Sequence, residues 1–449
     1  MKALNRTLIE AEFLSSEGDV SGSRIYLPAG WAVRNLIFRK ASLLLDAAGF
    51  QEFHMPSILR KSHIERLDNL TPISSKYFPL TEDLRLAATH EAVFFPFALE
   101  QIAKRGRRLP LNLYHLGPAY RSPRTAPVPF NLGERFSYLE VFSVCRPNEY
   151  ERWSGVLFSW ATQMTISLMN LPSVRVRRPR YGNLGFSDQT LTVETMLPLG
   201  RTFCTAMVYR QGSMFTRLFS MGDEPFSGLK SVHAGITDNL FFAYLANCMD
   251  ADGFTLHSEF AVTQVLISCP ENDERSRALA HSLKIRLEAI GARALISFRA
   301  SRNASRDLGL FRKQGIPVFI SIEPVLARDG CGRAYSRSSP SKGTVIDLSN
   351  APEINALIVA HDIWMARRLE AFSEASIGHA RNLDECKELI RAGKIARFYL
   401  QDDGAAVAEL DAMLPGAEVL GYDTEPLNYG GSILNGSQAG KICYAAKRL

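Results

Sequence analysis

The stretch 113-LYHLGPAYRSPRTAPVPFNLGERFSYLEVF-142 predicts a strand, a long loop and a return strand. Leu113–Arg121 is apolar and aromatic, and the extended pattern resumes at Phe136. Between them, Ser122–Gly133 carries three prolines, an asparagine and a glycine, which are typical of a loop. Arg121 ends the first strand and faces this loop, a placement that suits the binding of a phosphate. The alternative is an ordinary surface hairpin with solvated charges.

The composition is that of a globular protein with a mild basic excess. The chain has 449 residues, 46% hydrophobic and 22% charged, with a net charge of +6. This length suggests about two to four domains, and the charge is compatible with a polyanionic partner. Seven cysteines contain no CxxC pair, so we expect neither zinc nor disulfides, and a reduced, cytoplasmic location. The sequence has no membrane-spanning stretch, no Walker loop and no GxGxxG.

The segments before the hairpin predict two helix-containing units. Apolar residues at helical spacing between Val33 and Ala48, followed by Gly49, predict a helix, and Phe50–Met55 predicts a strand that ends at Pro56. A short strand over Leu84–Ala88 then leads through Thr89-His90-Glu91 into a helix from Ala92 to about Lys104. Thr89 could simply cap this helix, and Glu91 could simply interact with its dipole.

The segments after the hairpin predict a helix and then more sheet. Asn148–Asn170 has helical spacing. Residues 172–185 hold four arginines that alternate with apolar residues or proline, which favours an exposed edge strand over a polyanion contact. Further strands are predicted over Thr190–Glu194, Thr202–Tyr209 and Met214–Met221. Ser231–Tyr244 then predicts a strand that continues through Gly235 into a helix.

A composition shift near Ala261 marks the start of a different unit. From Val262, strands and helices alternate up to a closing helix over Glu353–Ala371, which predicts an α/β domain. A last segment with a short helix and two strands begins near Ser373. We therefore predict domains over residues 1–261, 262–372 and 373–449.

Taken together, these elements resemble class II aminoacyl-tRNA synthetases, most of all prolyl-tRNA synthetases of the archaeal and eukaryotic type. The helix and strand ending at Pro56 resemble motif 1, which implies a homodimer. Thr89 and Glu91 resemble the Thr-x-Glu loop that binds the ammonium of the amino acid. The hairpin resembles motif 2, which implies that Arg121 is the catalytic, phosphate-binding arginine. Ser231–Tyr244 resembles motif 3.

The same resemblance implies the rest of the nucleotide site and the fold. Phe136 matches the aromatic residue on which adenine stacks, and Glu140 matches an acidic residue of the return strand. The implied fold class is α+β: an antiparallel sheet flanked by helices, an α/β anticodon-binding-like domain and a small α+β C-terminal domain. The resemblance to the anticodon-binding domain rests mainly on the run SFRASRNASRDLGLFRKQGIPV at 297–318. The resemblance to the small C-terminal domain rests on the tail GKICYAAKRL. RNA contact through Arg302, Arg306 and Lys313 is a hypothesis, and a solvated face is the alternative.

The sequence departs from the family pattern at positions that carry chemistry. Arg121-Ser122-Pro123 lacks the glutamate that follows the motif 2 arginine, and Asn239 falls where motif 3 has an arginine. Met207-Val208-Tyr209 stands opposite the family's Thr-Ser-His segment. The zinc-binding cysteines of the family's C-terminal domain are missing, and Cys443 alone cannot hold a metal.

Because the motif 3 arginine is missing, we consider more than one function. Adenylate formation joins two anions, and losing one cationic group that stabilises the transition state costs a few kcal/mol, on the order of hundreds-fold in rate. Arg124, Arg135 or Arg217 could replace it. We weigh a non-catalytic accessory paralogue that binds an amino acid or tRNA against an active ligase that uses ATP with Mg²⁺. A third hypothesis is an adenylating enzyme that charges no tRNA. The sequence does not reveal the amino acid.

Overall fold

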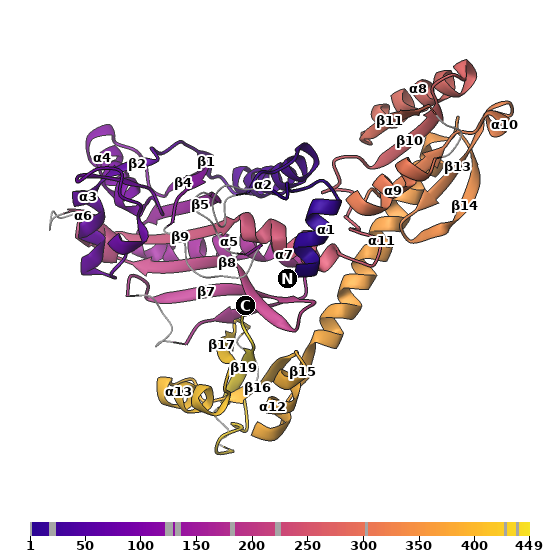
Figure 1. Ribbon diagram of the computed structural model, residues 1–449. Coiled ribbons are helices and arrows are strands. Elements are labelled where there is room, and N and C mark those ends of the chain that lie inside the picture. The colour runs from indigo at the N-terminus through magenta and orange to yellow at the C-terminus, as the bar shows by residue number, and fades with distance from the viewer. Residues whose placement is uncertain are drawn as a thin grey trace. The chain divides into compact units, whose positions relative to one another are not determined.

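The hairpin of β4 (Leu111–Ala119) and β5 (Phe136–Cys145) lies next to β1, toward one end of a large sheet in the computed structural model (Figure 1). The described residues form two compact units. The first unit consists of residues 2–17, 24–37 and 245–371, and the second draws on residues 38–244 and 372–449. Among the described residues, no helix is both long and apolar enough to cross a membrane. The structure describes residues 2–17, 24–121, 129–130, 136–179, 185–220, 226–300, 304–425, 429–436 and 440–449.

The large sheet belongs to the second unit and is mostly antiparallel. Within the described residues its order is β1-β4-β5-β9-β8-β7-β6-β17-β19-β16-β15, with β18 paired to β19. Only the end pairs, β1 with β4 and β15 with β16, are parallel there. The strands are β1 (Gln51–Glu52), β4 (Leu111–Ala119), β5 (Phe136–Cys145), β6 (Ser173–Arg177), β7 (Gln189–Leu197), β8 (Arg201–Gly212), β9 (Lys230–Thr237), β15 (Ile377–His379), β16 (Ile395–Leu400), β17 (Glu418–Asp423), β18 (Tyr429–Gly430) and β19 (Gly440–Ala446).

Helices cover the two faces of this sheet because each face carries its own apolar set. Leu113 and Phe142, directly paired across the hairpin, pack with Phe94 and Phe95 of α4 (Glu91–Arg105) and Phe215 of α6 (Met214–Ser220). On the other face lies α5 (Tyr150–Thr162), which contacts β8 and β9 and continues as a π-helix over Gln163–Leu168. The remaining helices and strands that lie wholly in this unit are α3 (Lys61–Glu65), β2 (Ile58–Arg60), β3 (Leu84–Leu86), α12 (Leu383–Arg391) and α13 (Gly404–Met413).

Two predictions for this unit are wrong. Met214–Met221 was expected as a strand, but Met214–Ser220 forms helix α6, which places Phe215 and Phe219 on one side against Phe95. A short apolar run fits either period, and packing against α4 decided for the helix. The basic strand is not an edge: β6 pairs with β7 and with β17, and its arginines form ion pairs with Glu425 and Asp402.

The first unit holds the predicted α/β arrangement. Its sheet has the order β11-β10-β12-β13-β14, with the first three strands parallel. Its core includes Val265, Ile267, Leu283 and Val318. The elements are β10 (Val265–Pro270), α8 (Glu274–Ala289), β11 (Ala294–Arg299), α9 (Ser305–Gln314), β12 (Val318–Ser321), α10 (Pro324–Ala327), β13 (Cys331–Ser336) and β14 (Ser339–Asp347), besides α1 (Lys2–Glu10).

The structure confirms most of the helices expected from periodicity. They include α2 (Pro28–Ala47), α7 (Asp238–Cys248) and α11 (Ala351–Ser376), each close to its expected range. The helix α13 and the strand β17 were not anticipated, because their sequences lack a clear period. The division into three domains at residues 261 and 372 stays a prediction.

Candidate functional site

The Thr89-His90-Glu91 segment is buried at the start of α4. Its three side chains are 5%, 0% and 5% exposed. The Tyr77 hydroxyl donates a hydrogen bond to the Thr89 carbonyl at 3.3 Å, which fixes the segment from outside. Thr89 also hydrogen-bonds Glu91 directly. The segment is therefore more than a helix cap, since its side chains turn into the protein rather than toward solvent.

Glu140 of β5 receives most of the hydrogen bonds from this segment. The Thr89 hydroxyl donates to Glu140 Oε1 at 2.8 Å, and the backbone N–H of His90 donates to the same oxygen at 3.2 Å. The His90 ring contacts the other carboxylate oxygen through Nδ1. Glu140 is fully buried. Its described contacts thus join it to the Thr89–Glu91 segment, whereas its expected nucleotide contact stays a prediction.

His233 of β9 completes the cluster from the neighbouring strand. Its Nδ1 lies 3.0 Å from Glu91 Oε1, and its Nε2 lies 3.8 Å from Glu140 Oε1. The ring is stacked on Phe142 at a centroid distance of 4.5 Å. Sequence reasoning missed His233 and His90. The signal for His233 was its place in the strand of the motif 3 segment, which pairs with β5.

Charge pairing keeps both carboxylates ionised. Burial raises the pKa of Glu91, but the charge and hydrogen bond of His233 leave it below its usual value. Burial likewise opposes ionisation of Glu140, and the charge and hydrogen bond of His90 hold the pKa of Glu140 low. Burial disfavours the His90 imidazolium, yet Glu140 raises the pKa of His90 overall. A buried pair of anions is a suitable receptor for a ligand ammonium group.

Arg121 and Phe136 lie together at the mouth of the hairpin. The Arg121 guanidinium is 5.1 Å from the centre of the Phe136 ring, within the range of a cation–π interaction. Phe136 clusters with Ala119 and Tyr138. Among the described residues, Arg121 Nε is buried without a hydrogen-bond partner. The loop positions Arg124 and Arg135 lie outside the described residues.

Asn239 lies at the N-terminus of α7, next to the start of β5. The neighbouring Asp238 accepts a hydrogen bond from the backbone N–H of Ser137 at 2.8 Å, which ties the two elements together. Asn239 is 6% exposed, and its side-chain oxygen has no hydrogen-bond partner within the part of the chain that the structure describes. Arg217, a suggested substitute cation, is in α6.

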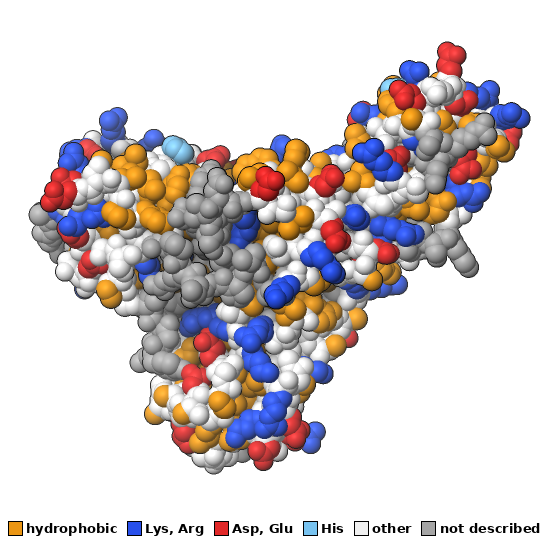
Figure 2. Space-filling model, viewed as in Figure 1, with side chains coloured by type: hydrophobic (Ala, Val, Ile, Leu, Met, Phe, Trp, Pro, Cys, Tyr) orange, Lys and Arg blue, Asp and Glu red, His pale blue; other side chains and the backbone are white. Residues whose placement is uncertain are grey.

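The expected RNA-contact residues lie in the other unit. Arg306 and Lys313 are on α9 and line a surface pocket of about 850 Å³ that also includes Glu10, Glu12 and Glu271. Arg302 lies outside the described residues. Figure 2 shows Lys and Arg standing among acidic and hydrophobic side chains on the visible face. RNA contact stays a prediction. In the described ranges, no group of three His, Cys, Asp or Glu side chains is placed to hold a metal ion.

The fold is that of prolyl-tRNA synthetases, which are class II enzymes. The structure of the Cryptosporidium parvum enzyme complexed with L-proline and AMP matches with a TM-score of 0.89 and 16% identity, over 99% of this chain and 94% of that chain. The Giardia lamblia enzyme in complex with prolyl-adenylate matches with a TM-score of 0.89 and 17% identity, over 100% and 98% of the two chains.

Curated sequences show the same relationship. The chain is 23% identical over 418 residues to proline–tRNA ligase of Methanoregula boonei, covering 87% of this chain and 85% of the relative. It is 24% identical over 409 residues to proline–tRNA ligase of Methanothermobacter thermautotrophicus, covering 85% and 82%. No family model matches the sequence. The chain is thus related in sequence to archaeal proline–tRNA ligases and has the prolyl-tRNA synthetase fold.

Proposed function

We propose that this chain is a non-canonical or accessory relative of prolyl-tRNA synthetases with an eroded ATP site, and that it binds an amino acid, tRNA or both. The observation that carries the proposal is Asn239 at the start of α7, where the family pattern has an arginine. Asparagine provides neither the charge nor the two-pronged donor geometry of a guanidinium. The residues expected around the amino acid keep the carboxylate of Glu91, whereas those expected around the phosphates lack one arginine.

The acidic cluster supports the binding of an amino acid. Glu91 is ionised and buried, and its partner His233 faces it with one ring nitrogen, Nδ1, at Glu91 Oε1. A ligand ammonium placed beside Glu91 and the Thr89 hydroxyl would make charge-assisted hydrogen bonds, each of about 1.5–3 kcal/mol. The aromatic residues Phe142 and Tyr209 flank His233 and would exclude water from such a ligand.

The arrangement of the arginines supports weak ATP chemistry. Arg121 lies over Phe136, whereas Arg448 is bound to the buried carboxylate of Glu194. In-line attack of a carboxylate on the α-phosphate brings two anions together, so positively charged groups must lie beside both reactants. With one guanidinium fewer, we expect transition-state stabilisation to fall by about 3 kcal/mol, or more than a hundredfold in rate.

An active ligase is the second candidate, favoured by the Arg121–Phe136 arrangement. Phe136 would stack on adenine while Arg121 grips the α-phosphate. Both carboxylates of the site, Glu91 and Glu140, are engaged by imidazoles. Mg²⁺ would therefore be held chiefly by the phosphates of ATP, as is common for this ion.

The remaining parts of the proposal concern partners and location. A homodimer through the segment of α2 and β1, contact with tRNA, a cytoplasmic location and a C-terminal region without zinc all stay proposals. Relationship to proline–tRNA ligases supports tRNA and an amino acid as binding partners.

Two measurements separate the candidates. Isothermal titration with each common amino acid should give saturable binding, weakened at least about tenfold by Glu91→Gln because a charged hydrogen bond is lost. The control is Glu100→Gln, an exposed residue on the same helix, which should bind like the wild type. Amino-acid-dependent exchange of pyrophosphate into ATP should be absent or very slow. Fast exchange that Arg121→Ala abolishes would favour the ligase, and unchanged binding by Glu91→Gln would refute the amino-acid site.

A further inference from the structure

One helix of the first unit carries apolar side chains on its exposed face. Val359 and Ile363 of α11 are 50% and 49% exposed, and Ala356 and Ala360 are exposed beside them. Residues three and four apart are neighbours on a helix surface, so these four side chains form one apolar stripe. The outer face of a surface helix is usually polar, and an exposed apolar patch with a polar border is typical of an interaction site.

The other face of α11 already packs against its own unit. The ring of His361 lies with Nε2 at 2.8 Å from the Leu256 carbonyl oxygen. The carboxylate of Asp362 accepts a hydrogen bond from the backbone N–H of Ser258 at 2.7 Å. The side chains buried on this face are Ile354, Ile358, His361, Met365 and Leu369. The apolar stripe therefore points away from the core of the unit.

Opposite charges stand at the two ends of the stripe. Glu353 comes seven residues before Ala360, and Arg367 comes seven residues after it. Seven residues are about two turns, so both charges lie on the same side of the helix as Ala360. Within the described residues, the Glu353 carboxylate is bonded only to the neutral amide of Asn350, at 3.1 Å. The Arg367 guanidinium has no hydrogen bond or ion pair in that part of the chain.

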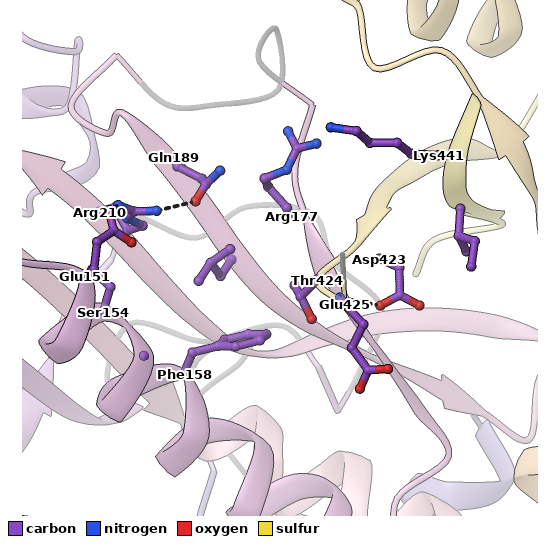
Figure 3. A pocket seen from close by; sticks show the side chains of 13 residues that line it. Glu151, Ser154, Phe158, Arg177, Gln189, Arg210, Asp423, Thr424, Glu425 and Lys441 are labelled. Atoms are coloured by element: carbon purple, nitrogen blue, oxygen red, sulfur yellow. Dashed lines mark hydrogen bonds and ion pairs between the residues drawn. The ribbon is translucent and has the colours of Figure 1, made fainter. Parts of the chain in front are cut away.

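Arginines elsewhere at the surface show the more usual arrangement. In the pocket of Figure 3, Arg210 donates a hydrogen bond to Gln189 at 2.8 Å. Arg177, on the same lining, forms an ion pair with Asp402. Arg367 differs because its own unit supplies no such partner among the described residues. Its position beside an apolar stripe suggests that a second molecule supplies one.

We propose that α11 pairs with α11 of a second copy of this chain, antiparallel and around a two-fold axis at Ala360. In such a pair, position 353 of one copy lies opposite position 367 of the other, because both are seven residues from the centre. Glu353 and Arg367 would therefore form two ion pairs related by the axis. Val359 and Ile363 would pack between them, and the small side chain of Ala360 lets the helices approach closely.

The charges also select the direction of the pair. A parallel pair in register would place Glu353 beside Glu353 and Arg367 beside Arg367, and like charges repel. The contact spans about four turns of helix, which is small beside the roughly 800 Å² per partner of a standard interface. We therefore expect reversible association in the micromolar range. The contact uses a different helix from the proposed homodimer and needs no amino acid, so it goes beyond the proposed function.

Charge reversal tests both the contact and its register. Sedimentation velocity of the full chain at rising concentration should show reversible association. Glu353→Arg and Arg367→Glu should each weaken it about tenfold or more, because each creates two like-charged pairs across the axis. The double variant with both reversals restores opposite charges and should associate like the wild type. A general effect on folding would not produce this recovery.

A second pair of variants tests the apolar stripe. Ile363→Asp should abolish the association, because it places a charge in the middle of the contact. The matched control is Val325→Asp, which changes a side chain that is 72% exposed elsewhere in the same unit and should associate like the wild type. The proposal is overturned if the mass of the wild type does not rise with concentration, or if the double reversal associates no better than the single ones. Equal losses in Val325→Asp and Ile363→Asp would also overturn it.

Discussion

The buried carboxylate of Glu194 allows a quantitative test of how the C-terminal strand is held. Glu194 is 0% exposed and accepts hydrogen bonds from Arg448 on both oxygens and from Thr192 at 2.9 Å. Burial raises the pKa of Glu194, but the charges of Arg448 and Arg178 leave it below its usual value. In Glu194→Gln the charge is lost, and the new amide N–H groups face the guanidinium.

The loss of folding stability in Glu194→Gln can be judged from how deeply this ion pair is buried. Breaking a buried ion pair on one side typically costs about 3–5 kcal/mol. We expect about 3 kcal/mol, because the Arg448 side chain is 26% exposed and keeps Glu418 at 2.8 Å. The control is Glu418→Gln, which removes the other carboxylate from the same arginine. Glu418 is 42% exposed, so this change should cost less than about 1 kcal/mol.

Hydrogen exchange measures the effect at the strands that the ion pair joins. The backbone N–H of Thr202 donates to the Lys447 carbonyl at 2.8 Å, so loss of the pair should loosen the end that follows β19. Protection in β7 and β19 should fall by about a hundredfold in Glu194→Gln, while that in β10 stays unchanged. Equal effects of the two variants, or unchanged protection in β19, would refute the reasoning.

Further predictions concern packing and pH. A Cβ at Gly117 would lie 2.2 Å from His115 Nε2, so Gly117→Ala should lower the free energy of unfolding by about 1–3 kcal/mol. A Cβ at Gly155 would meet no atom within 4 Å, so Gly155→Ala should raise the free energy of unfolding by about 0.5–1 kcal/mol. Urea unfolding measures both changes. Phe142→Ala should cost about 3–5 kcal/mol in the same assay, because this ring is fully buried between Phe94 and His233. Burial lowers the pKa of His257 to about 4 from 6.5. Between these pH values the unfolded chain binds more protons than the folded chain, so the folded state loses stability as the pH falls. The loss reaches roughly 3 kcal/mol near pH 4, and the full stability is present above pH 6.5. Urea midpoints from pH 4.5 to 7 test this, and a slope unchanged in His257→Gln would contradict it.

Local periodicity was enough to predict much of the secondary structure. The β4–β5 hairpin, helix α2 and the alternation of β10, α8, β11, α9 and β12 have clear repeats that report on their own stretch of chain. The order of the motifs then indicated the synthetase fold. The same reasoning failed for α6, where seven residues fit a strand or a helix equally well and contact with α4 decided the outcome.

Tertiary structure alone decided which charges meet. Glu140 and the Thr89–Glu91 segment, about fifty residues apart in sequence, come together because α4 packs against the β4–β5 hairpin, and the pairing of β5 with β9 brings His233 beside both. The arginines of β6 suggested an exposed edge, yet β17 pairs along that edge, and their ion-pair partners Glu425 and Asp402 follow β17 and β16. Arg177 forms an ion pair with Asp402, whereas the adjacent Arg178 contacts Glu194 of β7. The sequence by itself thus determined the elements and their order, because periodicity is local, whereas register and strand neighbours, set by distant segments, determined the fate of each charge.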